Sequence, residues 1–259
     1  MSLQNGFLQG KRGLIVGVAN EHSIAAGIAG VLSDAGAELA LTYLSDKAKP
    51  FVAPVAETCG AKMLLPLDVI DDAQMAQVFD DIAKTWGRLD FLVHSIAFCP
   101  KDDLHGRVTD SSKAGFLQAM DISVHSFARL AKLAEPLMLE NGGSLLTVTY
   151  YGAEKVVDHY NVMGPVKSAL ESLTRYMASE LGPQGIRVNA ISPGPLMTRA
   201  ASGIEHFDDL ARHAETRAPL RRLVTIEEVG QSALCLLSDQ SSAMTGNIMY
   251  VDGGYHVMS

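Results

Sequence analysis

The chain has 259 residues, 47% of them hydrophobic, and no shift in composition divides it, so we expect one α/β domain over residues 1–259. The net charge of −8 excludes a basic nucleic-acid surface, and the absence of a long apolar run or a secretory segment indicates a cytoplasmic protein without a membrane span. Cys59, Cys99 and Cys235 lie far apart without ligand spacing, so the sequence predicts neither disulfides nor a metal site.

The first predicted unit is a strand, a turn and a helix over residues 13–36. Gly17, Ser23 and Gly27 form a G-x5-S-x3-G pattern within it. A glycine turn lets the backbone approach a pyrophosphate, and the helix N-terminus at Ser23 and Ile24 offers free N–H groups and a positive dipole end. The pattern therefore predicts a dinucleotide site, although such glycines also serve as plain turn residues.

The second predicted strand, residues 38–43, ends where dinucleotide-binding sheets read the adenosine ribose. Leu44 stands there, followed by Asp46 and Lys47, so there is neither a clear carboxylate for the ribose diol nor an arginine for a 2′-phosphate. We expect NADH, with NADPH as the alternative. Asp68 ends the next strand and either accepts a hydrogen bond from the adenine amino group, which we favour, or caps the following helix.

Further strands are expected over residues 62–67, 89–97, 144–150, 186–192 and 247–254, with helices between them, including 71–86 and 226–237. This alternation predicts a Rossmann-like, doubly wound parallel sheet of about seven strands with helices on both faces. His94, at the end of the fourth strand, is expected to be a core histidine. Residues 195–224 follow a Pro-Gly-Pro breaker and show little apolar periodicity, which predicts a mobile lid over a substrate.

The candidate chemistry lies in a helix-like segment that carries Tyr160 and Lys167. Seven residues are nearly two helical turns, so the two side chains are expected on one face. A nearby ammonium favours the phenolate and so lowers the pKa of the phenol, which can then donate a proton or stabilise an enolate. Tyr151 and Lys155 form a competing Tyr-x3-Lys pair, but Gly152 follows Tyr151 before any helix begins, so we favour Tyr160 and Lys167.

These motifs together resemble the short-chain dehydrogenase/reductase superfamily across essentially the whole chain. Within it the sequence is most similar to bacterial enoyl-acyl-carrier-protein reductases. The resemblance rests on GVAN..SIA.GIA at 17–29, HSIAF at 94–98, Tyr150 with GAE at 152–154, YNVMG..K at 160–167 and AASGI at 200–204.

The resemblance implies a homotetramer that uses NADH to reduce a trans-2-enoyl thioester, carried on acyl carrier protein, in fatty-acid elongation. It assigns the enolate to Tyr160, the nicotinamide ribose to Lys167 and the thioester carbonyl to Tyr150, with Cys99 at the substrate. The residues that it places against the cofactor are Gly17, Ser23, Ile24, Leu44, Asp68, Val69, Ile96, Leu196, Met197, Thr198, Arg199 and Ala200.

Two features depart from the family pattern. Pro165 lies between Tyr160 and Lys167, where it kinks a helix unless it occupies the first turn. The acidic residues Glu205, Asp208 and Asp209 follow AASGI where relatives often carry basic ones, which leaves open whether the carrier is acyl carrier protein or coenzyme A. Two other functions remain as alternatives: a reductase of ketones in the same superfamily, and a nucleotide-binding regulator without catalysis.

Overall fold

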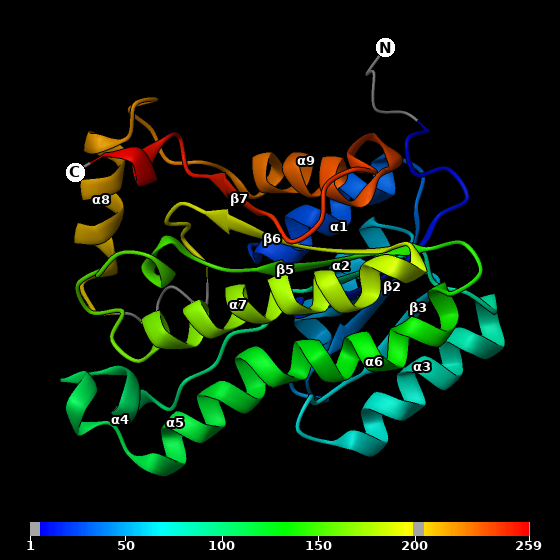
Figure 1. Cartoon of the computed structure of the whole chain (residues 1–259), viewed down its shortest axis with the longest axis horizontal. Coiled ribbons are helices and arrows are strands. Elements are labelled where there is room, and N and C mark those ends of the chain that lie inside the picture. The colour runs from blue at the N-terminus through cyan, green and yellow to red at the C-terminus, as the bar shows by residue number, and fades with distance from the viewer. Residues whose placement is uncertain (1–5, 199–204, 259) are drawn as a thin grey trace.

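The computed structural model describes residues 6–198 and 205–258, which form one seven-stranded parallel sheet (Figure 1). The strand order is β3-β2-β1-β4-β5-β6-β7, so the order reverses between β1 and β4. The strands are β1 Arg12–Val16, β2 Glu38–Tyr43, β3 Met63–Pro66, β4 Phe91–His94, β5 Gly143–Val148, β6 Ile186–Pro193 and β7 Ile248–Val251. The predicted doubly wound parallel sheet is confirmed.

Helices cover both faces of the sheet (Figure 1). Those of one face are α1 Ile24–Asp34, α2 Lys49–Thr58 and α9 Ile226–Leu237, and those of the other are α3 Asp72–Trp86, α6 Ser126–Met138 and α7 Met163–Leu181. A π-helical turn, Asp121–His125, joins α5 Lys113–Met120 to α6. Every helix within the described residues is too short or too polar to cross a membrane.

Successive side chains along each strand point to opposite faces of the sheet, so the protein has two hydrophobic cores, one on each face. Leu14 and Val16 of β1 pack with the α3, α6 and α7 layer, whereas Ile15 packs with the α1, α2 and α9 layer. Successive side chains of a strand point to opposite faces, so strands buried on both sides are apolar throughout. The sheet is therefore held rigidly between two layers, and its edges can carry a site.

Local capping explains where the helices begin. Ser23 is the N-cap of α1, and Asp71 caps α3 by accepting from the backbone N–H groups of Ala73 and Gln74. Asp68 does not cap that helix, so the capping alternative for Asp68 is wrong. Thr225 and Glu228 form a reciprocal capping box before α9, which begins at Ile226 as predicted.

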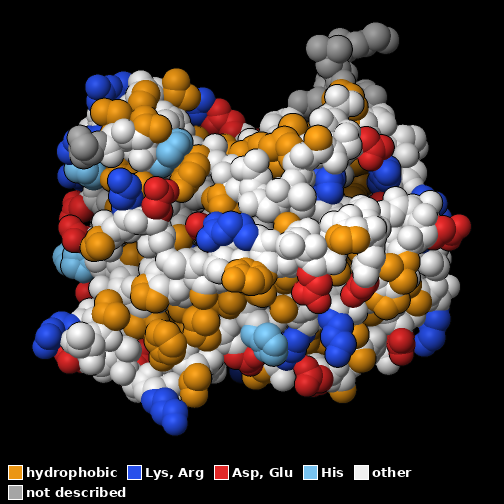
Figure 2. Space-filling view, viewed as in Figure 1, with side chains coloured by type: hydrophobic (Ala, Val, Ile, Leu, Met, Phe, Trp, Pro, Cys, Tyr) orange, Lys and Arg blue, Asp and Glu red, His pale blue; other side chains and the backbone are white. Residues whose placement is uncertain are grey.

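All seven strands run parallel, so their carboxyl ends meet at one edge of the sheet, the left side of Figure 1. Two further helices lie at this edge: α4 Lys101–Leu104 and α8 Phe207–Arg217. In α8, Phe207, Ala211 and Ala214 are buried at helical spacing, so the expectation of little periodicity is wrong there. Figure 2 shows hydrophobic side chains gathered on the face formed by α5, α6 and α7.

Candidate active site

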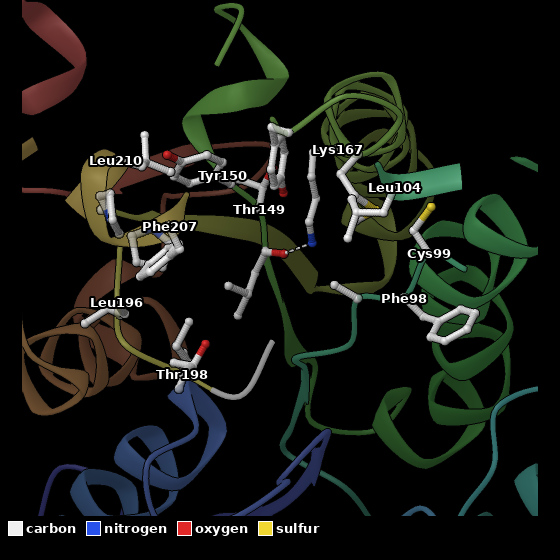
Figure 3. A pocket seen from close by; sticks show the side chains of 18 residues that line it. Phe98, Cys99, Leu104, Thr149, Tyr150, Lys167, Leu196, Thr198, Phe207 and Leu210 are labelled. Carbon is white, nitrogen blue, oxygen red and sulfur yellow. Dashed lines mark hydrogen bonds between the residues drawn. The ribbon is translucent and has the colours of Figure 1, made fainter. Parts of the chain in front are cut away.

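The carboxyl ends of β5 and β6 and the segment after β4 surround a cavity of about 330 Å3 (Figure 3). Leu196, Phe207 and Leu210 lie on one side of it, and Leu104 and Cys99 lie on the other. The polar side chains in its wall include Thr149, Tyr150, Tyr160, Lys167 and Thr198. The cavity is therefore a mostly apolar space with a few convergent polar groups, as expected for an enzyme site.

Two tyrosine rings meet in the wall of the cavity. The centroids of Tyr150 and Tyr160 lie 4.8 Å apart in an edge-to-face arrangement. Burial raises the pKa of both phenols, so both are protonated donors at neutral pH. The Tyr150 hydroxyl is buried and has no hydrogen-bond partner among the residues that the structure describes. An unpartnered buried donor is costly, and a substrate oxygen in the cavity would satisfy it.

Tyr160 does not belong to the helix that carries Lys167, because α7 begins at Met163. The residues on either side of Tyr160 have left-handed backbones, with φ of 63° at His159 and 43° at Asn161, which a right-handed helix cannot include. The prediction of one shared helical face is therefore wrong. The turn itself directs Tyr160 into the cavity that Lys167 also lines.

Pro165 is the third residue of α7, within the first turn. N–H groups in the first turn have no intrahelical acceptor, so proline removes no helical hydrogen bond there. The helix continues unbroken to Leu181, and Pro165 produces no interruption that would displace Lys167.

Lys167 is 4% exposed, and its Nζ donates to the carbonyl oxygen of Val148 at 2.7 Å (Figure 3). Burial lowers the pKa of Lys167 to about 8, and the carboxylate of Glu171 opposes that fall. The pKa of Tyr160 is raised by burial first, and then by Tyr150 and Glu171. The expected lowering of the pKa of Tyr160 is therefore wrong, because loss of solvation dominates at a fully enclosed phenol.

The competing pair, Tyr151 and Lys155, lies outside the cavity. Tyr151 begins a short 3-10 turn, Tyr151–Ala153, and its ring contacts Tyr255. Lys155 is exposed, and neither residue lines the cavity. His94 is fully buried, with its ring nitrogens within hydrogen-bond distance of the hydroxyls of Thr147 and Ser126, which confirms a core histidine.

Gly17 forms the turn after β1, with φ of +106°. A Cβ there would lie 2.1 Å from the carbonyl oxygen of Ser95, so only glycine fits. Ser23 Oγ accepts from the backbone of Ala26 and donates to the carbonyl of Asn20. The next residue, Ile24, lines the cavity. The first turn of α1 therefore faces the same edge of the sheet as the tyrosines.

The other predicted cofactor residues follow successive strands along this edge. Leu44 is 61% exposed after β2, and Ile96 is half-buried after β4. The carboxylate of Asp68 accepts from the backbone N–H of Ile70, while Val69 is buried in the core. After β6, Leu196 and Thr198 line the cavity and Met197 is exposed. Arg199 and Ala200 lie outside the described residues.

Sequence reasoning missed several parts of the site. The apolar wall of the cavity also includes Phe98, Leu104, Met163, Phe207 and Leu210. Among these residues, only those in the segment 207–214 had a signal in the sequence, which is its helical spacing. Cys99, predicted at the substrate, lines the cavity, and burial raises the pKa of its thiol to about 11.

A second missed feature lies near the lining residue Leu104. Glu205 pairs with His105 at 3.2 Å and with His159 at 3.8 Å, joining the end of α4 to the turn before Tyr160. These three residues are far apart in the sequence, so no local pattern could have indicated their contact.

The residues at the carboxyl edge of the sheet fit the binding of a dinucleotide. Gly17 lets the turn after β1 pack closely against the backbone of Ser95, and the N-terminus of α1 stands beside that turn at the point where the strand order reverses. The cavity continues from Ile24 of this helix to Lys167. Among the described residues, no group of three or more His, Cys, Asp or Glu side chains could hold a metal ion.

Comparison with known proteins gives a consistent result. A family model described as enoyl-(acyl carrier protein) reductase matches residues 17–256. An NADH-dependent enoyl-[acyl-carrier-protein] reductase of Rhizobium meliloti is 54% identical, over 100% of this chain and 94% of the relative.

Solved structures agree as well. The reductase of Anaplasma phagocytophilum in complex with NAD has a TM-score of 0.94 and 50% identity, covering 98% of this chain and 96% of the other. The Bacillus cereus enzyme with NADP+ and indole naphthyridinone has a TM-score of 0.95 and 44% identity, covering 98% and 99%. With its fold, its Gly17 turn and its match over nearly the whole length, the chain belongs to the enoyl-(acyl carrier protein) reductase family.

Proposed function

We propose that the protein is an enoyl-acyl-carrier-protein reductase that uses NADH to saturate trans-2-enoyl thioesters in fatty-acid elongation. The observation that carries this function is the pair of buried, protonated phenols, Tyr150 and Tyr160, beside the Lys167 ammonium in an apolar cavity. Relatives with this name, 54% and 47% identical over 94% and 96% of their length, support it. NADPH is the alternative hydride donor, since a relative of known structure holds NADP+.

NADH, when bound, supplies the hydride that adds to the β-carbon of the enoyl group. The negative charge that develops moves to the thioester oxygen, giving an enolate. The Tyr160 hydroxyl donates a hydrogen bond to that oxygen, and the Tyr150 hydroxyl lies near the thioester carbonyl. A neutral phenol aimed at a developing oxyanion in a water-poor cavity stabilises the transition state more than the ground state. The α-carbon of the enolate then takes a proton from solvent, which completes the reduction.

The carboxyl edge of the sheet would hold the cofactor. We assign the pyrophosphate to the Gly17 turn and the α1 N-terminus at Ser23 and Ile24, and the nicotinamide ribose to Lys167. Leu44, Asp68 and Val69 would contact the adenosine part of the cofactor, and Ile96 and the residues from Leu196 to Ala200 would contact the rest of it. Cys99 contacts the acyl chain.

Residues 195–224 form a lid in this proposal. Support comes from Leu196, Thr198, Phe207 and Leu210, which all line the cavity from this stretch. The contacts of the Glu205 carboxylate with the His105 and His159 rings connect it to the end of α4 and to the turn before Tyr160. We propose that the substrate enters here, attached to acyl carrier protein.

We propose a cytoplasmic homotetramer built from one domain. The apolar surface over α5, α6 and α7 (Figure 2) supports an interface, with Phe116, Leu117 and Tyr176 exposed on these helices by 36%, 55% and 76%. Exposed apolar patches of this kind mark contacts between proteins. Sedimentation of the purified protein tests the assembly.

The test of function follows NADH oxidation with a short trans-2-enoyl thioester, on acyl carrier protein and on coenzyme A. Tyr160→Phe removes the donor and is expected to lower kcat by about 100-fold or more. Lys155→Met, which alters an exposed lysine of the competing pair, is the control and should match the unmodified protein. Turnover of a β-ketoacyl substrate alone would establish a ketone reductase, and NADH binding without any turnover would establish a regulator.

A further inference from the structure

Glu171 is a buried acidic residue close to the site, and the chemistry above does not use it. It lies one helical turn after Lys167 in α7, and it is 9% exposed beside a lysine that is 4% exposed. Residues four apart on a helix are neighbours on one face. Lys167 lines the cavity, and the Glu171 carboxylate, one turn further along the same face, is near enough to favour the charged form of that lysine. Buried charges of this kind are rare unless they are paired.

Two consecutive residues at the end of β5 hold this pair. The carbonyl of Val148 accepts from Lys167 Nζ at 2.7 Å, and the hydroxyl of Thr149 donates to Glu171 Oε1 at 2.8 Å. Thr149 is itself buried and lines the cavity. The strand end and the helix are therefore joined by two adjacent bonds, one to each charged side chain.

The surrounding charges show which group acts on Lys167. His94 faces it from β4, but burial keeps that imidazole neutral, with a pKa of about 3. Among the described residues, Glu171 is the group whose charge favours the Lys167 ammonium. Glu171 in turn is faced by Glu154 from the turn after β5 and by Arg175 on α7. Burial raises the pKa of Glu171, and the hydrogen bond from Thr149 opposes that rise.

We propose that Glu171 is a positioning residue for the reduction: its carboxylate, held by the Thr149 hydroxyl, keeps Lys167 protonated at the wall of the cavity. The proposal rests on the proposed function, in which the Lys167 ammonium binds the nicotinamide ribose. A buried lysine without a counter-charge releases its proton more readily. Glu171 therefore sets the upper end of the pH range over which the site binds its cofactor.

The test uses Glu171→Gln, which keeps the acceptor for Thr149 and removes the charge. Its control is Glu180→Gln, the same change at an exposed position of α7, about 14 Å further along the helix. Two quantities are measured from pH 6 to 10: kcat/KM for NADH with an enoyl thioester, and the dissociation constant of NADH from the protein alone, by NADH fluorescence.

In Glu171→Gln the basic limb of both pH profiles is expected to move to lower pH by about one unit. A shift of about one unit is at the low end of the pKa shifts that a nearby opposite charge produces. At a pH above the transitions of both proteins, kcat/KM and the affinity for NADH should be about tenfold lower in the variant than in the unmodified protein. At pH 6 the variant should match the unmodified protein, because Lys167 is charged in both. Glu180→Gln should retain the original limb.

Thr149→Val and Thr149→Ser guard against a simple folding defect in Glu171→Gln. The valine variant loses the donor and is expected to shift the limb in the same direction by a smaller amount, whereas serine keeps the hydroxyl and should restore it. Limbs of Glu171→Gln and Thr149→Val that coincide with that of the unmodified protein would overturn the proposal. If the unmodified protein binds NADH but reduces no enoyl thioester, the proposed function fails instead, and the binding profile still tests Glu171.

Discussion

Replacing Lys167 by methionine should make the protein more stable while removing its activity. Lys167 is buried, and burial lowers the pKa of its ammonium from 10.5 to about 8. A tenfold change in proton affinity corresponds to about 1.4 kcal/mol, so keeping this group charged in the folded protein at pH 7 costs about 3 kcal/mol. Methionine has a similar length and no charge, so this cost disappears.

Part of the gain is offset by the lost hydrogen bond. The carbonyl of Val148 accepts from Lys167 Nζ, and a bond of this kind contributes about 1 kcal/mol. The net expectation is that Lys167→Met raises the free energy of unfolding by about 2 kcal/mol at pH 7. Lys155→Met, at an exposed site, should change it by less than about 0.5 kcal/mol.

The sign of the pH dependence follows from the same pKa. Below pH 8 Lys167 is charged in both the folded and the unfolded chain, so the full cost is present. Between pH 8 and 10.5 the unfolded chain binds more protons than the folded one, so the stability of the unmodified protein rises with pH. The advantage of Lys167→Met should therefore shrink over this range and vanish near its upper end.

Urea unfolding of the protein without cofactor, at one fixed protein concentration and at pH 7, 8.5 and 10, measures this difference. A methionine variant that is less stable than the unmodified protein at pH 7, with the same denaturant dependence, would refute the reasoning. It would mean that the hydrogen bond and packing of Lys167 outweigh the burial of its charge.

Three further predictions concern the scaffold of the site. Gly17→Ala places a Cβ 2.1 Å from a carbonyl oxygen at φ of +106°, so it should lower the free energy of unfolding by about 3 kcal/mol or more and weaken NADH binding. Gly30→Ala, at a position of α1 with open space, is the control and should raise the free energy of unfolding by about 0.5 kcal/mol. Urea unfolding and NADH titration measure both variants. His94 is neutral in the folded protein, because its pKa is lowered from 6.5 to about 3. The stability of the unmodified protein should therefore fall by about 1.4 kcal/mol per pH unit below pH 6.5, and His94→Gln should flatten that slope. An equal slope in both proteins would contradict this account. Thr225→Ala removes the capping hydroxyl of α9 and should lower the free energy of unfolding by about 1 kcal/mol in the same urea assay, while an unchanged midpoint would mean that packing alone fixes the start of the helix.

The sequence itself determined most of the fold. Strand β2 and helix α9 have the bounds that their apolar patterns predicted, because each pattern is local and strands buried on both faces must be apolar throughout. Gly17 and Ser23 were found for the same reason, since a tight turn and a helix cap each have a short signature. The choice of Tyr160 and Lys167 over Tyr151 and Lys155 also came from local spacing, although the shared helix that the same spacing predicted is wrong.

Only the tertiary structure decided the charge states of the site. Tyr160 was expected to have a lowered pKa beside Lys167, but burial raises it, and the same burial lowers that of Lys167. The groups that bury them and set their partners come from β5, α4 and α8, as far away in sequence as Leu104 and Phe207. A pKa depends on what excludes water from a side chain, and that is a property of distant segments brought together by folding, which no local pattern of residues records.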